Sequence, residues 1–136
     1  MLCCSAMLMI VAVVIAALLS MRGNLPPAPV GQDAAATGFS SQRAQAVLTR
    51  ILGDQRPHPT GSKANAEVRD RVVAEFARLG LVAEMQRRFA CGSSTCATVE
   101  NIVARLPGAR QDHAVLLSAH YDSVAAGPGA SDDGAG

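Results

Sequence analysis

The residues whose types and spacing could do chemistry lie at the carboxyl-terminal end of the sequence. His120 and Asp122 are separated by one residue, and a glycine-rich loop leads from them to the acidic pair Asp132 and Asp133. Imidazole nitrogen and carboxylate oxygen are ligand atoms of zinc, and a hydrolytic zinc site keeps one further position open for water. This arrangement predicts a metal site that uses His120 and one member of the acidic pair.

The element expected to position this site is a buried strand over residues 114–119, which form a short apolar run. Side chains alternate along a strand, so His120 and Asp122 should point to the same side. Asp122 can then bind the metal directly or orient the imidazole through its second nitrogen. Asp132 or Asp133 could bridge two cations about 3.5–4 Å apart, as in co-catalytic metal pairs.

Each part of the motif is a weak signal by itself. A histidine at the end of a strand is more often structural than a ligand, and Asp-Asp-Gly in a glycine-rich loop is usually a solvated turn. The combination is much more specific, because a strand, the H-x-D motif, a glycine loop and an acidic pair follow one another in a fixed order.

This combination resembles a known family. His120-Tyr-Asp-Ser123, followed by Pro128-Gly-Ala-Ser-Asp-Asp-Gly-Ala-Gly136, is similar to the first two metal-ligand motifs of the dizinc aminopeptidases, metallopeptidase family twenty-eight. Upstream, Arg56-Pro-His-Pro-Thr-Gly-Ser62 and Asn65-Ala-Glu-Val-Arg69 resemble the membrane-anchored branch, which contains endoplasmic-reticulum metallopeptidases and vacuolar membrane proteases. The likeness covers about residues 40–136.

The resemblance implies an α/β fold, the N-terminal part of a zinc-exopeptidase-like three-layer αβα domain. It also implies two zinc ions, with His120 binding one, Asp132 bridging both, and Asp122 behind His120. Asp133 would follow the bridging residue without binding metal. The family's catalytic Glu and its later Glu, Asp and His ligands have no counterpart, since no Glu follows Glu100. The sequence is therefore expected to be an inactive N-terminal fragment of an enzyme that acts on peptide or protein substrates.

Three functions compete for these residues. The first is a membrane-anchored zinc aminopeptidase, in which a metal-activated water attacks the scissile carbonyl. The second is another dizinc amidohydrolase or a carboxypeptidase, although the Tyr-Asp-Ser context and the proline-glycine loop favour the aminopeptidase. The third is a membrane-tethered module without catalytic activity. Glutaminyl cyclases share the fold, but the doubled Asp132-Asp133 resembles the two-metal peptidases more.

The N-terminal segment, residues 1–21, has no charged side chain. A helix of this length, at about 1.5 Å per residue, can cross a bilayer core. No Lys or Arg precedes Arg22, so an uncleaved single-pass anchor is favoured over a cleaved signal. Arg22 alone would keep the following residues on the cytoplasmic side. One arginine is little evidence, however, and the resemblance places the peptidase part on the extracytoplasmic or lumenal side.

The remaining chain is expected to consist of a linker and one domain. Residues 22–39 contain three prolines and read as a linker, and residues 40–136 form the N-terminal part of the peptidase domain. Helical spacing and caps predict helices over about 40–53 and 62–79. Strands are predicted at 82–89, 98–106 and 114–119.

The second predicted helix has an apolar and a charged face. Its buried stripe is formed by Val68, Val72, Phe76 and Leu79. Glu67 with Arg71, and Arg71 with Glu75, have the i,i+4 spacing of weak helix-surface ion pairs, so the charges are expected to form a solvated face.

Three further residues are more simply structural. For His58, between two prolines, packing or hydrogen bonding in an ordered loop is favoured over metal binding. For Cys91 and Cys96 a disulfide is favoured over free thiols, and metal binding comes last because a zinc ribbon needs a second cysteine pair.

The net charge of the chain is +1, and it has no basic run and no aromatic cluster. This composition argues against a protein that binds nucleic acid electrostatically.

Overall fold

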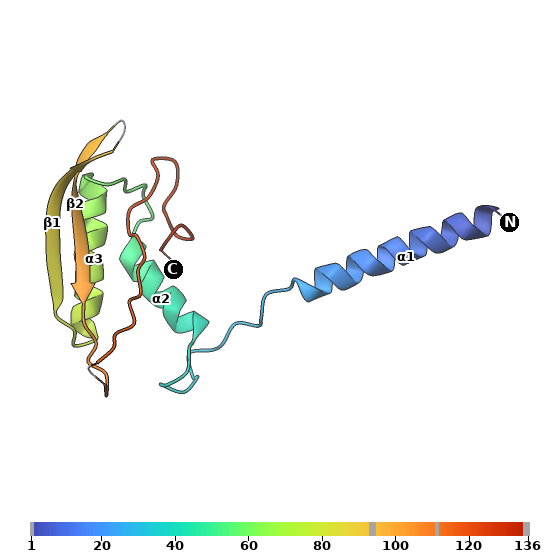
Figure 1. Cartoon of the computed structure of the whole chain (residues 1–136), viewed down its shortest axis with the longest axis horizontal. Helices are drawn as coiled ribbons and strands as arrows, with labels where there is room; N and C mark the ends of the chain where they lie inside the picture. Colours follow the sequence, from blue (N-terminus) through green and yellow to red (C-terminus); the bar gives the residue numbers. More distant parts are fainter. Residues whose placement is uncertain (1, 93–94, 111, 135–136) are drawn as a thin grey trace. The chain divides into compact units, whose positions relative to one another are not determined.

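The structure is a computed structural model that describes residues 2–92, 95–110 and 112–134. The chain divides into two compact units, Met1–Val30 and Gly31–Gly136 (Figure 1). In the first unit a single helix, α1, runs over Leu2–Gly23. Its stretch Ala6–Gly23 is apolar and long enough to span a membrane. By length and composition it fits a membrane anchor and a signal segment alike.

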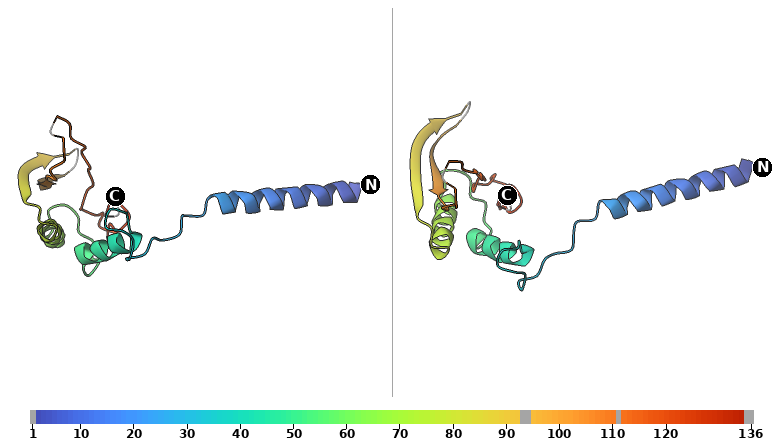
Figure 2. Two further views of the ribbon diagram at one scale, coloured as in Figure 1. Left: turned by 90° about the horizontal axis from the view of Figure 1, so that it is seen from below. Right: turned by 60° about the horizontal axis from the view of Figure 1, so that its bottom comes forward.

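The second unit contains two helices and a β-hairpin: α2 (Ser41–Leu52), α3 (Lys63–Arg78), β1 (Ala83–Cys91) and β2 (Cys96–Ala104). The strands pair antiparallel, from Ala83 opposite Ala104 to Cys91 opposite Cys96. Helix α3 contacts both strands and also α2, and it lies along one face of the hairpin (Figure 2). The predicted mixture of helix and strand is thus confirmed, whereas the described residues do not form a three-layer αβα fold.

Both predicted helices are confirmed, together with their caps. The hydroxyl of Ser40 accepts from the Arg43 N–H at the start of α2, and the hydroxyl of Ser62 accepts from the Asn65 N–H at the start of α3. Helix α2 ends at Gly53, whose φ of 61° favours glycine. These signals are local in sequence, which is why spacing alone predicts them.

The predicted linker is partly bonded to the second unit. The Arg43 guanidinium donates to the backbone carbonyls of Gln32, Ala34, Ala35 and Gly38, at 2.6–3.4 Å. Residues 31–38 therefore belong to the second unit, and Arg43 holds their turns against the start of α2.

The apolar core of this unit is small. Leu52 and Val68 are buried, and Val72 and Phe76 of the predicted stripe are half-buried. Leu79 was predicted to belong to the same stripe, but it is 72% exposed. Because Leu79 is the C-cap of α3, it lies beyond the last helical turn, and its side chain does not point to the same side as the buried stripe.

The prediction of a buried strand at residues 114–119 is wrong for this structure. The segment is extended but pairs with no strand among the described residues. Val115, Leu116 and Leu117 are 87–90% exposed. An apolar run favours burial, but a strand forms only where a neighbour satisfies its backbone N–H and C=O groups, and here none does.

The predicted i,i+4 ion pairs on α3 are also not formed. Arg71 instead donates to the backbone carbonyls of Ile51, at 2.6 Å, and Leu52, at 3.3 Å. The last carbonyls of a helix have no hydrogen-bond partner inside that helix. A guanidinium from a neighbouring helix therefore forms a more stabilising hydrogen bond with them than with an exposed carboxylate. Glu67 and Glu75 pair with other arginines, and the charged face of α3 therefore fastens α2 instead of being simply solvated.

Glu75 is the most buried carboxylate of this face, and its removal gives a stability prediction. Its side chain accepts hydrogen bonds from Arg50, at 2.7 and 3.0 Å, and from Arg78, and Glu75 is 8% exposed. The hydrogen bond from Arg50 lowers the pKa of Glu75 below its usual 4.5. A pKa lowered by folding stabilises the protein above the unfolded-state pKa, and this stabilisation is lost as the pH falls through the folded-state pKa.

We therefore expect Glu75→Gln to lower the free energy of unfolding by about 1 kcal/mol at pH 7, because the ion pairs with Arg50 and Arg78 are replaced by hydrogen bonds to a neutral amide. The difference should shrink as the pH is lowered through the acidic range, which urea unfolding of the detergent-solubilised protein at several pH values will measure. Glu84→Gln, on the exposed hairpin, is the matched control. A deficit in Glu75→Gln that persists undiminished at acidic pH would contradict this assignment.

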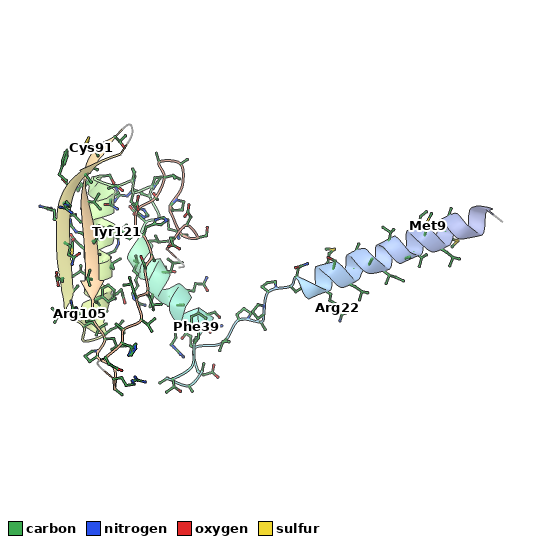
Figure 3. The ribbon with its side chains drawn as sticks, in the orientation of Figure 1. Met9, Arg22, Phe39, Cys91, Arg105 and Tyr121 are labelled. Atoms are coloured by element: carbon green, nitrogen blue, oxygen red, sulfur yellow. A yellow bond between two sulfur atoms is a disulfide. The ribbon has the colours of Figure 1, made fainter. Side chains whose placement is uncertain are left out.

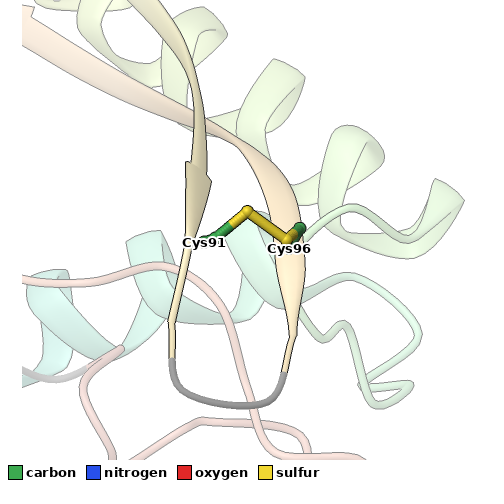
Figure 4. The surroundings of a disulfide bond; sticks show 2 residues. All are labelled: Cys91 and Cys96. Carbon is green, nitrogen blue, oxygen red and sulfur yellow. A yellow bond between two sulfur atoms is a disulfide. The ribbon is translucent and has the colours of Figure 1, made fainter.

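A disulfide links the two strands at the end of the hairpin where β1 leads into β2. Cys91 and Cys96 form the last residue pair of the β1–β2 register, and their sulfur atoms are bonded. Figure 3 labels Cys91 at one end of the hairpin and Arg105 at the other, and Figure 4 shows the bond crossing between the strands. The disulfide that was favoured for these two cysteines is the state that the structure contains.

Candidate metal centre

The structure brings the three predicted site residues together. His120 Nε2 lies 3.2 Å from Asp132 Oδ1. On the other side of the ring, His120 Nδ1 lies 3.2 Å from the backbone carbonyl oxygen of Asp122 and 3.3 Å from its Oδ1. The side chains are 51% exposed for His120 and 83% for Asp132. The imidazole is therefore bracketed by two carboxylates at a position open to solvent.

A tight loop carries the acidic pair back to the histidine. The Gly134 N–H donates to the Gly129 carbonyl at 3.0 Å, and Gly129 has a φ of 67°. A Cβ at Gly134 would meet that carbonyl oxygen at 2.7 Å, so a larger residue does not fit this turn. The loop thus places Asp132 beside the His120 ring. The peptide bond between Asp132 and Asp133 is cis.

The two neighbouring aspartates make different contacts. Asp132 approaches the imidazole, whereas Asp133 Oδ2 accepts from the backbone N–H of His120 at 3.4 Å. Asp133 therefore contacts the backbone of the motif, whereas Asp132 contacts the imidazole ring. This division agrees with the roles that the resemblance implies for the pair, although a metal role for Asp132 stays a prediction.

Tyr121 fixes the motif to the hairpin, a contact that the sequence did not predict. Its hydroxyl donates to the backbone carbonyl of Glu100 in β2 at 2.6 Å (Figure 3). Burial raises the pKa of Tyr121, and the Glu100 carboxylate adds to this effect. Arg69 and Arg87 in turn bind that carboxylate, and the hydrogen bond from Arg69 is the main reason that the pKa of Glu100 is lowered.

The loop between α2 and α3 also holds the motif, through hydrogen bonds to Asp122 and Ser123. Thr60 Oγ1 donates to Asp122 Oδ2 at 2.8 Å, and the His58 N–H donates to Ser123 Oγ at 2.7 Å. His58 is only 2% exposed, and its Nδ1 bonds the Arg56 carbonyl at 2.9 Å. The structural role favoured for His58 is thus confirmed. The roles of Thr60 and Ser123 were missed, although both lie in motifs that carried the family resemblance.

The donor atoms at His120 and Asp132 fit a shared zinc ion. Two ligand atoms about 2.0–2.2 Å from a tetrahedral zinc lie about 3.4 Å apart, close to the 3.2 Å between Nε2 and Oδ1. The hydrogen bond to the Asp122 carbonyl, followed by the contact with Asp132, raises the pKa of His120. Zinc needs the neutral ring, so the ion would replace the proton that Nε2 shares with Asp132.

The described residues supply two ligands at this point and no more. Across residues 2–92, 95–110 and 112–134, no group of three or more His, Cys, Asp or Glu side chains is arranged to hold a metal ion. His113, seven residues before His120, bonds Asp112. A structural or hydrolytic zinc ion takes at least three protein ligands, so a complete centre requires further donors.

The segment that carries these residues matches a known family. Residues 101–136, which include the whole motif, match Peptidase family M28. The vacuolar membrane protease of Eremothecium gossypii is 34% identical over 119 residues, 72% of this chain and 12% of the relative. Its counterpart in Schizophyllum commune is 32% identical over 142 residues, 96% of this chain and 15% of the relative.

A third vacuolar membrane protease, from Schizosaccharomyces pombe, is 33% identical over 94 residues, 59% of this chain and 11% of the relative. The chain therefore spans 11–15% of the length of the curated relatives that it matches. No solved structure matches it at a comparable level of significance.

Proposed function

We propose that the complete protein is a membrane-anchored, zinc-dependent aminopeptidase of Peptidase family M28, the family that residues 101–136 match. The observation that carries the proposal is the meeting of His120 Nε2 and Asp132 Oδ1 at 3.2 Å inside the matched segment. Substrates are peptides or proteins, from which the enzyme releases N-terminal residues. The likeness to vacuolar membrane proteases supports the membrane-bound peptidase class.

In this proposal, each site residue has a separate task. His120 would hold one zinc ion through its ring nitrogen, and Asp132 would provide the carboxylate shared with a second ion. Asp122 orients the imidazole from behind, and Asp133 holds the backbone N–H of His120. When bound, zinc supplies Lewis-acid polarisation of the scissile carbonyl and of the attacking water. We assign the general base and the remaining ligands to residues outside this sequence.

The exposed apolar run supports a larger sheet. Val115, Leu116 and Leu117 lead directly into His120 and are almost fully exposed in the described structure. Exposing three successive large apolar side chains is unfavourable, and burying each would gain about 1.5–3 kcal/mol. We therefore extend the proposal to the fold: this run becomes a buried strand of a three-layer αβα domain in the complete protein.

The anchor and the disulfide together support a location for the peptidase part. Helix α1 has the length and composition of a single membrane span. The Cys91–Cys96 disulfide persists in an oxidising compartment and is rare in the cytosol. We place the residues after α1 on the extracytoplasmic or lumenal side, with α1 retained as an anchor.

Metal removal tests the proposed activity. We expect the full-length protein to hydrolyse aminoacyl reporter amides, to lose this activity on prolonged dialysis against a chelator, and to regain it when zinc is restored. A reporter with an acetylated N-terminus is the matched substrate control and should not be cleaved, because an aminopeptidase needs the free amine.

Three outcomes separate the alternatives. Equal cleavage of the acetylated reporter, or cleavage from the carboxyl terminus, would indicate another dizinc hydrolase or a carboxypeptidase. Undiminished activity after exhaustive chelation would exclude the metal mechanism. A zinc-loaded protein that cleaves none of these substrates would favour a tethered module without catalytic activity.

A further inference from the structure

We propose that Thr60 is a positioning residue for the metal centre, acting on the His120 imidazole through the carboxylate of Asp122. The inference rests on the proposed function, because it takes His120 to be a zinc ligand. It concerns a residue in the loop between α2 and α3, far from the motif in sequence and outside the segment that matches the family.

The two carboxylate oxygens of Asp122 are used by different partners. Thr60 Oγ1 donates to Oδ2 at 2.8 Å, while Oδ1 lies 3.3 Å from His120 Nδ1. A rotation of the carboxylate that improved one contact would break the other. The Thr60 hydroxyl therefore fixes the orientation in which Oδ1 faces the ring.

The loop that carries Thr60 is itself held against the motif by a reciprocal backbone contact. The His58 N–H donates to Ser123 Oγ at 2.7 Å, and the Ser123 N–H donates to the His58 carbonyl at 3.2 Å. His58 and Ser123 are 2% and 6% exposed, so water does not compete for these bonds. Thr60 is thus placed beside Asp122 by a buried attachment two residues away in the loop.

The consequence for the imidazole concerns its tautomer. When Nε2 binds the metal, Nδ1 must carry the hydrogen, and both atoms near Nδ1, the Asp122 carbonyl oxygen and Oδ1, are acceptors for it. The lone pair of the neutral ring is then on Nε2, which faces Asp132. A carboxylate held behind a ligating histidine fixes both the tautomer and the orientation of the ring, and it strengthens metal binding. Thr60 adds the hydroxyl that holds this carboxylate.

The test compares three variants of the full-length protein. Thr60→Val removes the hydroxyl at nearly constant shape, Thr60→Ala removes it together with the γ-methyl group, and Thr60→Ser keeps it. Zinc affinity is measured by competition with a chromophoric chelator. We expect Thr60→Val and Thr60→Ala to raise the zinc Kd about ten-fold. This is the lower end of the range expected when a residue that supports a metal ligand loses its contact. Ser should stay within about two-fold of the wild type.

Thr49→Val is the matched control. The Thr49 hydroxyl donates to the Gln45 carbonyl at 2.9 Å on the exposed side of α2, so this variant also loses one hydroxyl hydrogen bond but lies away from the motif. Its zinc Kd should equal that of the wild type. Thermal unfolding of the metal-free proteins provides the second readout, and a positioning role predicts similar small losses at Thr49 and Thr60.

Each failure has its own signature. A wild-type protein that binds no zinc would overturn the proposed function and this inference with it. Zinc bound by the wild type, with an unchanged Kd in Thr60→Val and Thr60→Ala, would overturn the inference and leave the proposed function intact. A Kd raised as much in Thr60→Ser as in Thr60→Val would also overturn it, because the hydroxyl would then not be the cause.

Discussion

Replacing His120 by alanine, or Asp132 by asparagine, is expected to remove zinc from the full-length protein and to lower kcat/KM by more than about 100-fold. Changes behind a metal ligand already cost about 10–100-fold, and loss of a ligand itself exceeds that. Nε2 and Oδ1, 3.2 Å apart, are the two donors that the described structure offers to one ion. Zinc content by elemental analysis and hydrolysis of an aminoacyl reporter measure both effects.

Two neighbouring residues provide matched controls. Asp133→Asn makes the same chemical change one position further on, but the asparagine oxygen can still accept from the His120 N–H. His113→Ala removes an imidazole that is bonded to Asp112. Both variants should keep their zinc and most of their activity. Zinc retained in Asp132→Asn but lost in Asp133→Asn would reverse the roles of the two aspartates.

Replacing Asp122 by asparagine is expected to weaken zinc binding about 10–100-fold without abolishing it. The substitution keeps the shape of the side chain and an oxygen for Thr60 Oγ1, but it removes the negative charge beside His120 Nδ1. Activity should fall at limiting zinc and recover in part when zinc is in excess. Titration of zinc against a competing chelator, followed by reporter hydrolysis, gives both quantities.

The same variant decides between the two roles that spacing left open for Asp122. If Asp122 were a direct ligand, Asp122→Asn would lose zinc as completely as His120→Ala, and excess metal would not restore activity. The matched control is Asp112→Asn, whose carboxylate bonds Arg110 on an exposed loop, at 2.6 Å, and should have no effect. Wild-type zinc affinity in Asp122→Asn would remove Asp122 from the centre.

The parts of the fold that the sequence predicts correctly depend on local signals. Ser40, Ser62 and Gly53 mark helix ends through bonds that span three or four residues, so their effect can be read from spacing. The two hairpin strands are adjacent in the chain, so their pairing needs only the short connection between Cys91 and Cys96. Residues 114–119 have equally suitable composition, but a strand there requires a partner that no local pattern specifies.

The charged residues show the same limit. Spacing assigned Arg71 to two carboxylates on its own helix, yet the guanidinium donates to the carbonyl of Ile51 on α2. The i,i+4 rule gives only a few tenths of a kcal/mol per pair. A buried helix end offers a charge-assisted hydrogen bond worth more, and its position depends on how the helices pack.

For the candidate site, the sequence predicts which residues take part, and the structure identifies the residues that hold them in place. The pairing of His120 with Asp132 was expected from residue type, order and resemblance, and the two side chains do meet. The contacts of Tyr121 with Glu100 and of Thr60 with Asp122 join residues 21 and 62 positions apart. A tyrosine or threonine has no distinctive pattern, so only the three-dimensional structure identifies these supports.

The most direct measurement is a crystal structure of the full-length protein grown with zinc, with anomalous diffraction recorded at the zinc edge. We predict two peaks, one about 2.0–2.1 Å from His120 Nε2 and both about 2.0–2.2 Å from oxygens of Asp132. Zinc peaks that touch neither side chain, in crystals where the enzyme is active, would contradict this prediction.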